Sequence, residues 1–466
     1  MKSKKAVTKM LSSDSFTISN LSKQLDAGKV SPIELTERAI EATKRYQPSV
    51  NTYITFTPEQ AMRDAEAIAR DIRVSGRKGP LHGIPYAVKD LIFAKGLPAT
   101  AGSKQMKDFV PDFDADCVAA MKKAGAILMG KTNTQEWGCG PAGDQSYFGA
   151  VRNPWDTARI SGGSSSGSAA AVATGMVPCA IGSDAGGSIR IPAALCSVVG
   201  FKPSFGLVSS KGTFSGSIHL GSIGPMTSTV EDAAIMLDVI SAPNPPIYAG
   251  SLSELSSLKG VRFAVPTNLF ENCIEPGVLA AFDTLLDTLR RAGADVAEVP
   301  IPWLADIPTL SCAITFPEIA YLHRQRLLDD PEGYQPAIKA RIERGFTFPA
   351  VEYIEAMQRR EELKRIWTDF MKDWSAVLMP TEPITAYPLF ETVHRINGRE
   401  EDSSALLVRH TRAANVIGCP ALSIPAGLSD GLPVGAMLMG GIGEDAKTLA
   451  IGHQIERIYP FPVFGK

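Results

Sequence analysis

The sequence predicts an α/β fold in which a β-sheet lies between layers of α-helices. Short apolar runs at 126–129 and 179–181 alternate with helical stretches at 116–123 and 230–240. The 466-residue chain is 44% hydrophobic and 21% charged, so it can bury a large core. The alternation resumes after a proline-rich loop at 243–246, which favours one domain over residues 1–466.

The N-terminal part, residues 1–78, is predicted to be a helical cap packed on the core. Ser31 and Pro32 form a helix start signal, because proline fits the first turn of a helix. Apolar and aromatic positions at 35, 39, 42 and 46 follow with helical spacing. We therefore expect helices throughout 16–75.

The remaining parts follow in order along the chain. Residues 79–242 form the catalytic core, and 243–302 continue it with a strand at 261–265 and a helix at 276–291. Residues 303–375 are mostly charged helical sequence and are expected to be an insertion near the active site. Residues 376–466 return to the core with a strand at 376–380.

Two glycine-serine clusters, at 162–168 and 186–188, indicate a serine nucleophile. A serine hydroxyl needs a base to take its proton and donors for the oxyanion that develops on the attacked carbonyl. Gly186 and Gly187 place bare backbone amides beside Ser188, and successive amides in a turn form an anion-binding concavity. Upstream, the segment GIPYAVKD supplies an isolated Lys89. The pattern is that of a serine hydrolase without a histidine.

The central run that begins at Arg159, RISGGSSSGSAAAVATGMVPCAIGSDAGGSIRIPAALCSVVGFKPSFGLVS, resembles the amidase signature family. Flanking segments fit as well: GIPYAVKD, GKTNTQEWG, RNPWD, GPMTSTVEDAA and GLPVGAMLMG. The resemblance implies an α/β fold with a mixed sheet between helices. It also implies that Ser188 is the nucleophile, that Ser164, after a cis peptide bond, relays its proton, and that Lys89 is the base.

The resemblance assigns further residues around these three. It implies an oxyanion hole formed by the backbone amides of Ala185, Gly186, Gly187 and Ser188, supporting roles for Ser165 and Arg190, and an acyl-site wall formed by Gly138, Cys139 and Gly140. The sequence departs from the usual family pattern at three positions. Ser161 replaces a proline, Ser166 a glycine and Ala185 a threonine, so any contact of that threonine hydroxyl is absent or replaced here.

Lys89 must be neutral to act as a base, although a free lysine has a pKa near ~10.4. Complete burial can lower the pKa of a lysine by ~3–5 units. Ile84, Ala87 and Val88 around Lys89 are typical of such a buried site. In the alternative interpretation, Lys89 is a surface cation that Asp90 neutralises.

Other interpretations of the serine clusters remain open. Ser164 could simply cap the helix expected at 169–174. The letters GSSSG also match a nucleophile elbow, which would make Ser165 the nucleophile, but the preceding residues are turn-like rather than a strand. The glycine-rich cluster lacks the Gly-Lys-Ser/Thr of a phosphate-binding loop.

The sequence therefore predicts a stand-alone amidohydrolase that acts on a carboxamide, for example an aryl amide, or on a carbamate or ester. One branch of the family serves as the glutaminase subunit of a tRNA-dependent amidotransferase. That branch usually carries a tyrosine-rich segment where this chain has RIERGFTFPAVEYIEAMQRREELKRIW. A third alternative is a silent binding protein, which intact Lys89, Ser164 and Ser188 argue against.

Composition limits the partners. The net charge of −2 gives no bias toward nucleic acid, and no stretch is long and apolar enough for a membrane span. Seven cysteines without metal-ligand spacing favour free thiols in a reducing compartment, and the basic N-terminus falls short of a signal peptide, so we expect a cytoplasmic protein. Neither a metal nor an organic cofactor is expected, and a monomer and a homodimer are equally admissible. Of six histidines, only His219 and His323 are candidates for the pocket.

Overall fold

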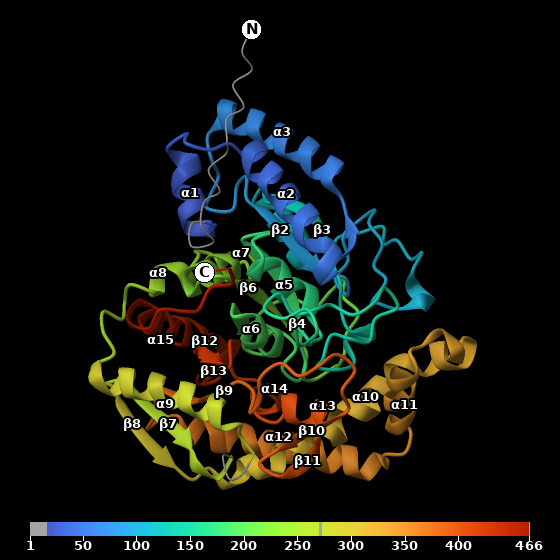
Figure 1. The fold of residues 1–466 in the computed structure, drawn as a ribbon, viewed down its shortest axis with the longest axis vertical. Coiled ribbons are helices and arrows are strands. Elements are labelled where there is room, and N and C mark those ends of the chain that lie inside the picture. The colour runs from blue at the N-terminus through green and yellow to red at the C-terminus, as the bar shows by residue number, and fades with distance from the viewer. Residues whose placement is uncertain (1–15, 270–272, 466) are drawn as a thin grey trace.

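The protein forms three layers, with helices on both faces of one large sheet (Figure 1). This computed structural model describes residues 16–269 and 273–465, so the basic segment at residues 1–5 lies outside the described part. None of the helices in the two described ranges combines the length and apolar character of a membrane span.

The sheet has 11 strands and is mixed. Its spatial order is β1 (Tyr53–Phe56), β3 (Ile127–Thr132), β2 (Pro85–Lys89), β4 (Cys179–Asp184), β6 (Ser222–Thr227), β5 (Val199–Lys202), β12 (Ala421–Ser429), β13 (Leu432–Met439), β9 (Ala376–Pro380), β7 (Arg262–Pro266) and β8 (Asp295–Val299). Strands β3, β2 and β4 run parallel, as do β9, β7 and β8, and antiparallel pairs join these two groups. The predicted mixed sheet between helices is confirmed.

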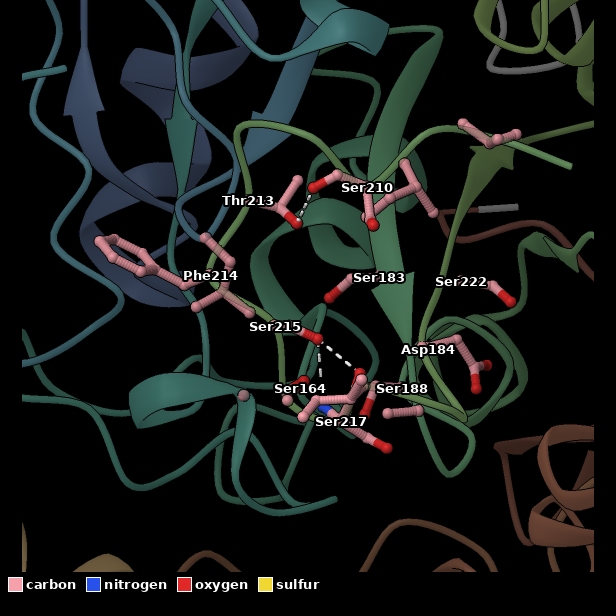
Figure 2. A pocket seen from close by; sticks show the side chains of 18 of the residues that line it. Ser164, Ser183, Asp184, Ser188, Ser210, Thr213, Phe214, Ser215, Ser217 and Ser222 are labelled. Carbon is pink, nitrogen blue, oxygen red and sulfur yellow. Dashed lines mark hydrogen bonds between the residues drawn. The ribbon is translucent and has the colours of Figure 1, made fainter. Parts of the chain in front are cut away.

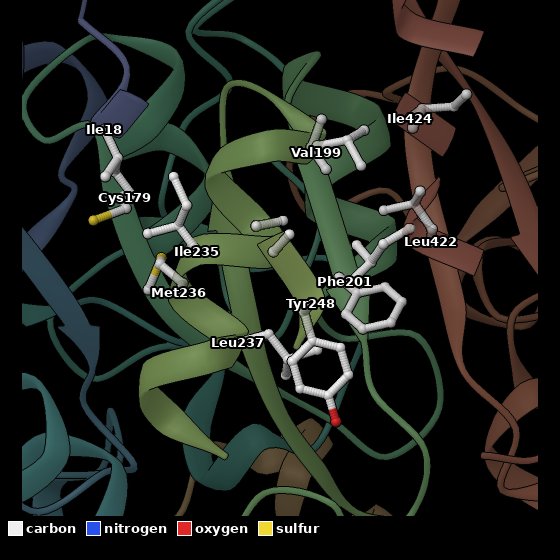
Figure 3. Close-up of a cluster of buried hydrophobic side chains, with 14 of the residues drawn as sticks. Ile18, Cys179, Val199, Phe201, Ile235, Met236, Leu237, Tyr248, Leu422 and Ile424 are labelled. Atoms are coloured by element: carbon white, nitrogen blue, oxygen red, sulfur yellow. The ribbon is translucent and has the colours of Figure 1, made fainter. Parts of the chain in front are cut away.

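Both faces of the sheet are buried, because successive side chains of a strand point to opposite faces. In β2, Tyr86 and Val88 belong to one core and Ala87 to the other. The same alternation in β9 sends Leu378 to the first face and Met379 to the second. Figure 3 shows part of the core on the first face, between the sheet and α7.

Different sets of helices cover the two faces. The first face is covered by α1 (Ile18–Asp26), α4 (Asp116–Lys123), α7 (Val230–Ile240), α8 (Tyr248–Ser251), α9 (Pro276–Arg291) and α15 (Asp445–Ile458). The second is covered by α2 (Pro32–Val50), α3 (Pro58–Ser75), α5 (Ser166–Ala173), α6 (Arg190–Cys196), α10 (Ile307–Asp329), α12 (Ala350–Phe370) and α14 (Arg412–Ile417).

Shorter elements complete the chain. Helix α11 (Pro336–Gly345) packs on α10 at the lower right of Figure 1. A separate hairpin, β10 (Val393–Ile396) with β11 (Arg399–Asp402), precedes α13 (Ser403–Leu407). Short 3₁₀ turns are η2 (Lys104–Met106), η3 (Glu136–Gly138), η4 (Thr267–Leu269), η5 (Pro302–Asp306) and η6 (Pro331–Gly333).

The helices predicted at 116–123, 230–240 and 276–291 and the strand at 376–380 have the predicted bounds. The start signal at 31–32 is also confirmed, since Ser31 caps α2 and forms a capping box with Glu34. The prediction of helices throughout 16–75 was wrong at one place. Strand β1 lies within this range, because Tyr53–Phe56 pairs with β3 and extends the sheet edge.

Candidate active site

Lys89 is the last residue of β2 and is completely buried. Its ammonium nitrogen lies 2.7 Å from the Ser164 hydroxyl oxygen, 3.0 Å from that of Ser165 and 2.9 Å from that of Ser183. The side chains of three serines therefore surround the nitrogen. Parallel strands β2 and β4 bring Lys89 and Ser183 to the same end of the sheet.

The three hydroxyls around Lys89 can satisfy the hydrogen bonds of an ammonium and also those of a neutral amine. A neutral amine has two N–H donors and one lone pair, whereas an ammonium has three donors and no acceptor. The Ser165 hydroxyl donates to the backbone oxygen of Ser183 at 3.1 Å, so it accepts from Lys89. If the Ser183 hydroxyl takes the second donor, the lone pair of Lys89 is left facing the hydroxyl proton of Ser164.

Burial lowers the pKa of Lys89 to about 7, although the negative charge of Asp184 opposes this shift. Asp90 does not neutralise Lys89. Its carboxylate pairs instead with a second buried lysine, Lys131, at 3.0 Å. The structure thus excludes the interpretation of Lys89 as a surface cation.

Ser164 lies in the loop that leads into α5. The peptide bond between Gly163 and Ser164 is cis. The backbone oxygen of Ser164 accepts a hydrogen bond of 2.8 Å from the Thr134 hydroxyl, which fixes the loop to the residues after β3. Ser164 does not cap α5, because the residue at the cap position is Ser165.

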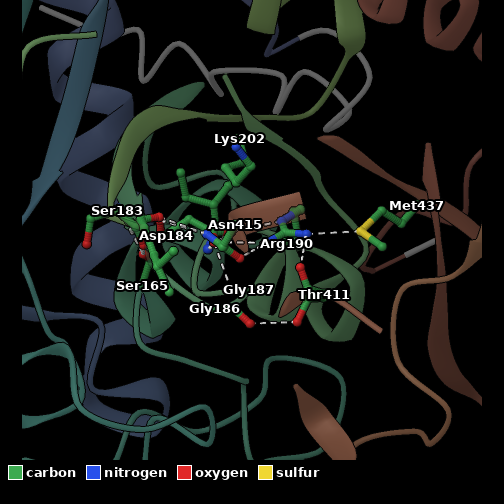
Figure 4. A network of polar contacts seen from close by, with 12 residues as sticks. Ser165, Ser183, Asp184, Gly186, Gly187, Arg190, Lys202, Thr411, Asn415 and Met437 are labelled. Carbon is green, nitrogen blue, oxygen red and sulfur yellow. Dashed lines mark hydrogen bonds and ion pairs between the residues drawn. The ribbon is translucent and has the colours of Figure 1, made fainter. Parts of the chain in front are cut away.

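The turn after β4 carries Ser188 and is built on a buried ion pair. The guanidinium of Arg190 binds both carboxylate oxygens of Asp184 at 2.9 Å (Figure 4). Burial alone would raise the pKa of Asp184, but the charge and hydrogen bonds of Arg190, with Asn415 and Lys202, hold it well below its usual value. Arg190 thus contacts the turn through Asp184, and Asn415 connects the pair to α14 by a hydrogen bond of 2.7 Å.

The predicted oxyanion hole needs a correction at Gly187. The amide of Gly187 donates to the Asp184 carboxylate at 2.8 Å and is therefore already used. Within the described residues, the amides of Ala185, Gly186 and Ser188 have no such acceptor. Gly187 has a φ of +129°, and a Cβ there would lie 2.3 Å from the Thr411 hydroxyl, so the turn requires glycine.

Ser188 is partly exposed and faces a cavity of about 100 Å³, which we call the serine pocket (Figure 2). Hydroxyl groups, apolar side chains and Asp184 line it. Its side chains include Ser164, Ser183, Ser188, Ser210, Thr213, Ser215, Ser217 and Ser222, together with Leu91, Phe205, Val208, Phe214, Ile218 and Ile223.

A second cavity of about 80 Å³, which we call the arginine pocket, is also lined by Ser188. It is lined by Arg341 and Arg412, by Ser311, Cys312, Thr315, Phe316 and Ile319 of α10, by Val408, and by Gly138, Cys139, Gly140, Pro141, Ala185 and Gly186. Gly138, Ala185, Ser188 and Gly216 line both cavities. Ser188 therefore lines both pockets, and helix α10 forms one wall of the second.

Ser165, the nucleophile of the elbow alternative, is completely buried and lines neither pocket. Its amide instead donates to the backbone oxygen of Ser188 at 3.1 Å. Nδ1 of His323 is hydrogen-bonded to the Tyr334 hydroxyl at 2.9 Å, and burial lowers the pKa of His323 to about 4. His219 is hydrogen-bonded to the Glu318 carboxylate. Neither histidine lines these pockets.

Glu318 of α10 was not identified from the sequence. Its carboxylate is buried and accepts hydrogen bonds from the Ser217 hydroxyl and from the amides of Ile218 and His219. It thereby ties α10 to the loop that forms one wall of the serine pocket. Nothing in the local sequence indicates its role, although it is the only glutamate of α10 and follows Pro317.

Cys139 lines the arginine pocket, and burial raises the pKa of its thiol to about 12. The seven cysteines are free. Over 16–269 and 273–465, no group of three or more His, Cys, Asp or Glu side chains is arranged to hold a metal ion.

Comparison with known proteins agrees with this architecture. The family model described as Amidase matches residues 34–449. A curated relative, one of the subunits of the glutamyl-tRNA(Gln) amidotransferase of Thioalkalivibrio sulfidiphilus, is 35% identical over 95% of this chain and 97% of its own length. A solved structure described as an amidase has a TM-score of 0.89 at 33% identity, over 95% of this chain and 99% of that one. The solved structure of the corresponding amidotransferase subunit from Thermotoga maritima has a TM-score of 0.79 at 32% identity, over 97% and 98%.

The fold and these matches define a hydrolase that acts on carbon–nitrogen bonds. The chain belongs to the amidase signature family.

Proposed function

We propose that this protein is a stand-alone amidohydrolase with Ser188 as nucleophile, Ser164 as proton relay and Lys89 as base. The observation that carries the proposal is the contact of 2.7 Å between the Ser164 hydroxyl and a buried lysine with a pKa of about 7. A neutral amine at this position can accept a proton at ordinary pH. The accessible Ser188 lines a pocket together with Ser164.

In the acylation step, the Ser188 oxygen bonds to the amide carbon while its proton passes to Ser164, and the proton of Ser164 passes to Lys89. The amides around Ser188 stabilise the oxyanion. The C–N bond then breaks, and the leaving nitrogen takes a proton from Ser164, which is reprotonated by Lys89. Water next attacks the ester carbon, gives a proton to the same relay, and releases the acid and the free Ser188. Carbamates and esters follow the same route.

Residues 303–375 act in this proposal as an insertion that closes the site, since α10 and α11 supply side chains to the arginine pocket. The structural likeness to the solved amidase is greater than that to the Thermotoga maritima protein. The second candidate is a glutaminase subunit of an amidotransferase. It is favoured by the 35% identity to the Thioalkalivibrio sulfidiphilus protein over nearly the whole of both chains.

The proposal is tested by reaction with a fluorophosphonate, followed by peptide mapping in wild type and in Lys89→Ala. We expect an adduct on Ser188 that is lost without Lys89. The matched variant Ser165→Ala should keep a Ser188 adduct, and an adduct on Ser165 in the wild type would overturn the assignment. Ammonia release by the purified chain from simple amides supports stand-alone action, whereas release that requires added partner subunits would favour the glutaminase candidate.

A further inference from the structure

An ion pair is buried directly beside Lys89. Asp90 follows Lys89 at the end of β2, and Lys131 lies on the neighbouring strand β3. The Lys131 ammonium lies 3.0 Å from the Asp90 carboxylate, and both side chains are completely buried. Parallel pairing of the two strands brings these residues together, because Lys89 lies opposite Thr132 in the register. The mechanism proposed above does not use this pair.

The ion pair joins the loop that follows β2 to the end of the strand. Lys131 donates a second hydrogen bond to the backbone oxygen of Pro98 at 3.2 Å. The other carboxylate oxygen of Asp90 accepts from the Thr100 amide at 2.8 Å and from the Thr100 hydroxyl. The amide of Ala101 donates to the backbone oxygen of Asp90 at 3.3 Å. The pair therefore holds the loop and the strand end in one position.

From this loop the contacts continue to the wall of the two pockets. The amide of Trp137 donates to the backbone oxygen of Ala101 at 2.7 Å, and Trp137 precedes Gly138, which lines both cavities. Ala101 and Trp137 have φ values of +54° and +55°. Residues other than glycine rarely adopt this region, so contacts such as these must hold the two residues in it. The ion pair thus connects Lys89 with the wall that Gly138 forms beside Ser188.

Stability alone does not account for this pair. Taking two charges out of water costs roughly as much as their attraction returns, and apolar side chains of similar volume are often equally stable. Burial lowers the pKa of Lys131, whereas the charge and the hydrogen bond of Asp90 oppose this change. Compared with apolar side chains, the pair supplies directed hydrogen bonds without adding net charge. Both properties matter beside a lysine that has to be neutral.

Two other titratable side chains act on Lys89. The carboxylate of Asp184 favours the ammonium form, and Arg190 pairs with this carboxylate. The second is Cys139, whose thiol stays protonated at ordinary pH because burial raises its pKa to about 12. Neither member of the ion pair on β2 and β3 shifts the pKa of Lys89. This is the result expected where a positive and a negative charge lie side by side and cancel.

We propose that Asp90 and Lys131 are positioning residues that fix the end of β2 at Lys89 and, because their charges cancel, leave no net charge beside it. This role rests on the proposed function, in which Lys89 must lose its proton to act. Without Lys131, the buried carboxylate of Asp90 would favour the ammonium form of Lys89. At an effective dielectric constant of about 20, a unit charge about 10 Å away moves the midpoint of a titration by about one pH unit.

The test follows the rate of fluorophosphonate labelling at Ser188 from about pH 5 to about pH 9 in wild type and variants. Lys131→Met leaves the charge of Asp90 unbalanced and should raise the midpoint by about 0.5–1 pH unit. Lys131→Gln removes the same charge but keeps a donor for Asp90, so it should give the same shift with less loss of stability. The double variant Asp90→Asn/Lys131→Met removes both charges and should return the midpoint to that of wild type.

Asp232→Asn is the control for a loss of stability. Asp232 is buried and accepts hydrogen bonds from the amides of Ile18 and Ser19, and it is not among the groups that act on Lys89. The change should therefore destabilise the protein without moving the midpoint. An unchanged midpoint in both single variants of Lys131, or an equal shift in the double variant, overturns the role of the pair.

Hydrogen exchange separates the role of the pair from the proposed function. If Lys89→Ala is labelled as fast as wild type, the catalytic assignment fails, but the pair should still hold the loop after β2. The amides of Thr100, Ala101 and Trp137 should then exchange at least about tenfold faster in Lys131→Met than in wild type. Equally slow exchange in the two proteins overturns the positioning role, whatever the labelling shows.

Discussion

Titration of Lys89 should control the rate of acylation. Burial brings its pKa to about 7, and only the neutral amine can take the proton that Ser164 relays. Since the pKa is lowered from the ordinary value of a lysine, the active form is the one present above pH 7. The neutral fraction is about one-eleventh at one pH unit below the pKa and about ten-elevenths at one unit above it.

We therefore expect kcat/KM for a neutral amide to rise about tenfold from about pH 6 to about pH 8 and then to level off. The assay is ammonia release at low substrate concentration across this range. The rate of fluorophosphonate labelling at Ser188 should follow the same curve, because it depends on the same proton transfer. Circular dichroism at each pH controls for unfolding. A rate that is flat over this range, or a midpoint near that of an ordinary lysine, would refute the reasoning.

Three further predictions concern the scaffold. Arg190→Met leaves the Asp184 carboxylate buried without its partner, so it should lower the free energy of unfolding by about 3–5 kcal/mol in urea titrations. The control Arg290→Met removes a solvent-accessible ion pair and should lower it by only about 0–1 kcal/mol. Gly187→Ala brings a Cβ against the Thr411 hydroxyl and should slow fluorophosphonate labelling of Ser188 by at least about tenfold. The control Gly260→Ala also stands at a positive φ but has open space around it, so it should leave the labelling rate unchanged. Glu318→Gln weakens the bonds that hold the wall of the serine pocket. It should raise KM several-fold, about 3- to 10-fold, with a smaller change in kcat, and an unchanged KM would contradict this role.

Local signals predicted much of the fold. The helices at 116–123, 230–240 and 276–291 are long or bounded well enough for periodicity and proline placement to define them. Strand β1 was missed because its four residues lie between two long helices and gain their partner only from β3, more than seventy positions away. Pairing at that distance leaves no trace in a short window of sequence.

The candidate site divides in the same way. Lys89, Ser164 and Ser188 were identified from clustered motifs, and the structure brings Lys89 into contact with Ser164. Arg341 and Arg412 carry no local signal, since a single arginine on a helix is ordinary. Only the structure shows that both arginines line one cavity and that, among the described residues, neither has a carboxylate within ion-pair distance. The use of the Gly187 amide by Asp184 likewise depends on turn geometry that sequence spacing does not determine.

The space around Ser188, which lines both pockets, bears on what can follow acylation. Once the amine has left, the space that it occupied beside Ser188 is vacant, while the acyl group is still bound to the serine oxygen. The next nucleophile must then arrive through the space that the first product used. A small amine such as hydroxylamine would compete there with water for the acyl group. The protein would then act as an acyl transferase.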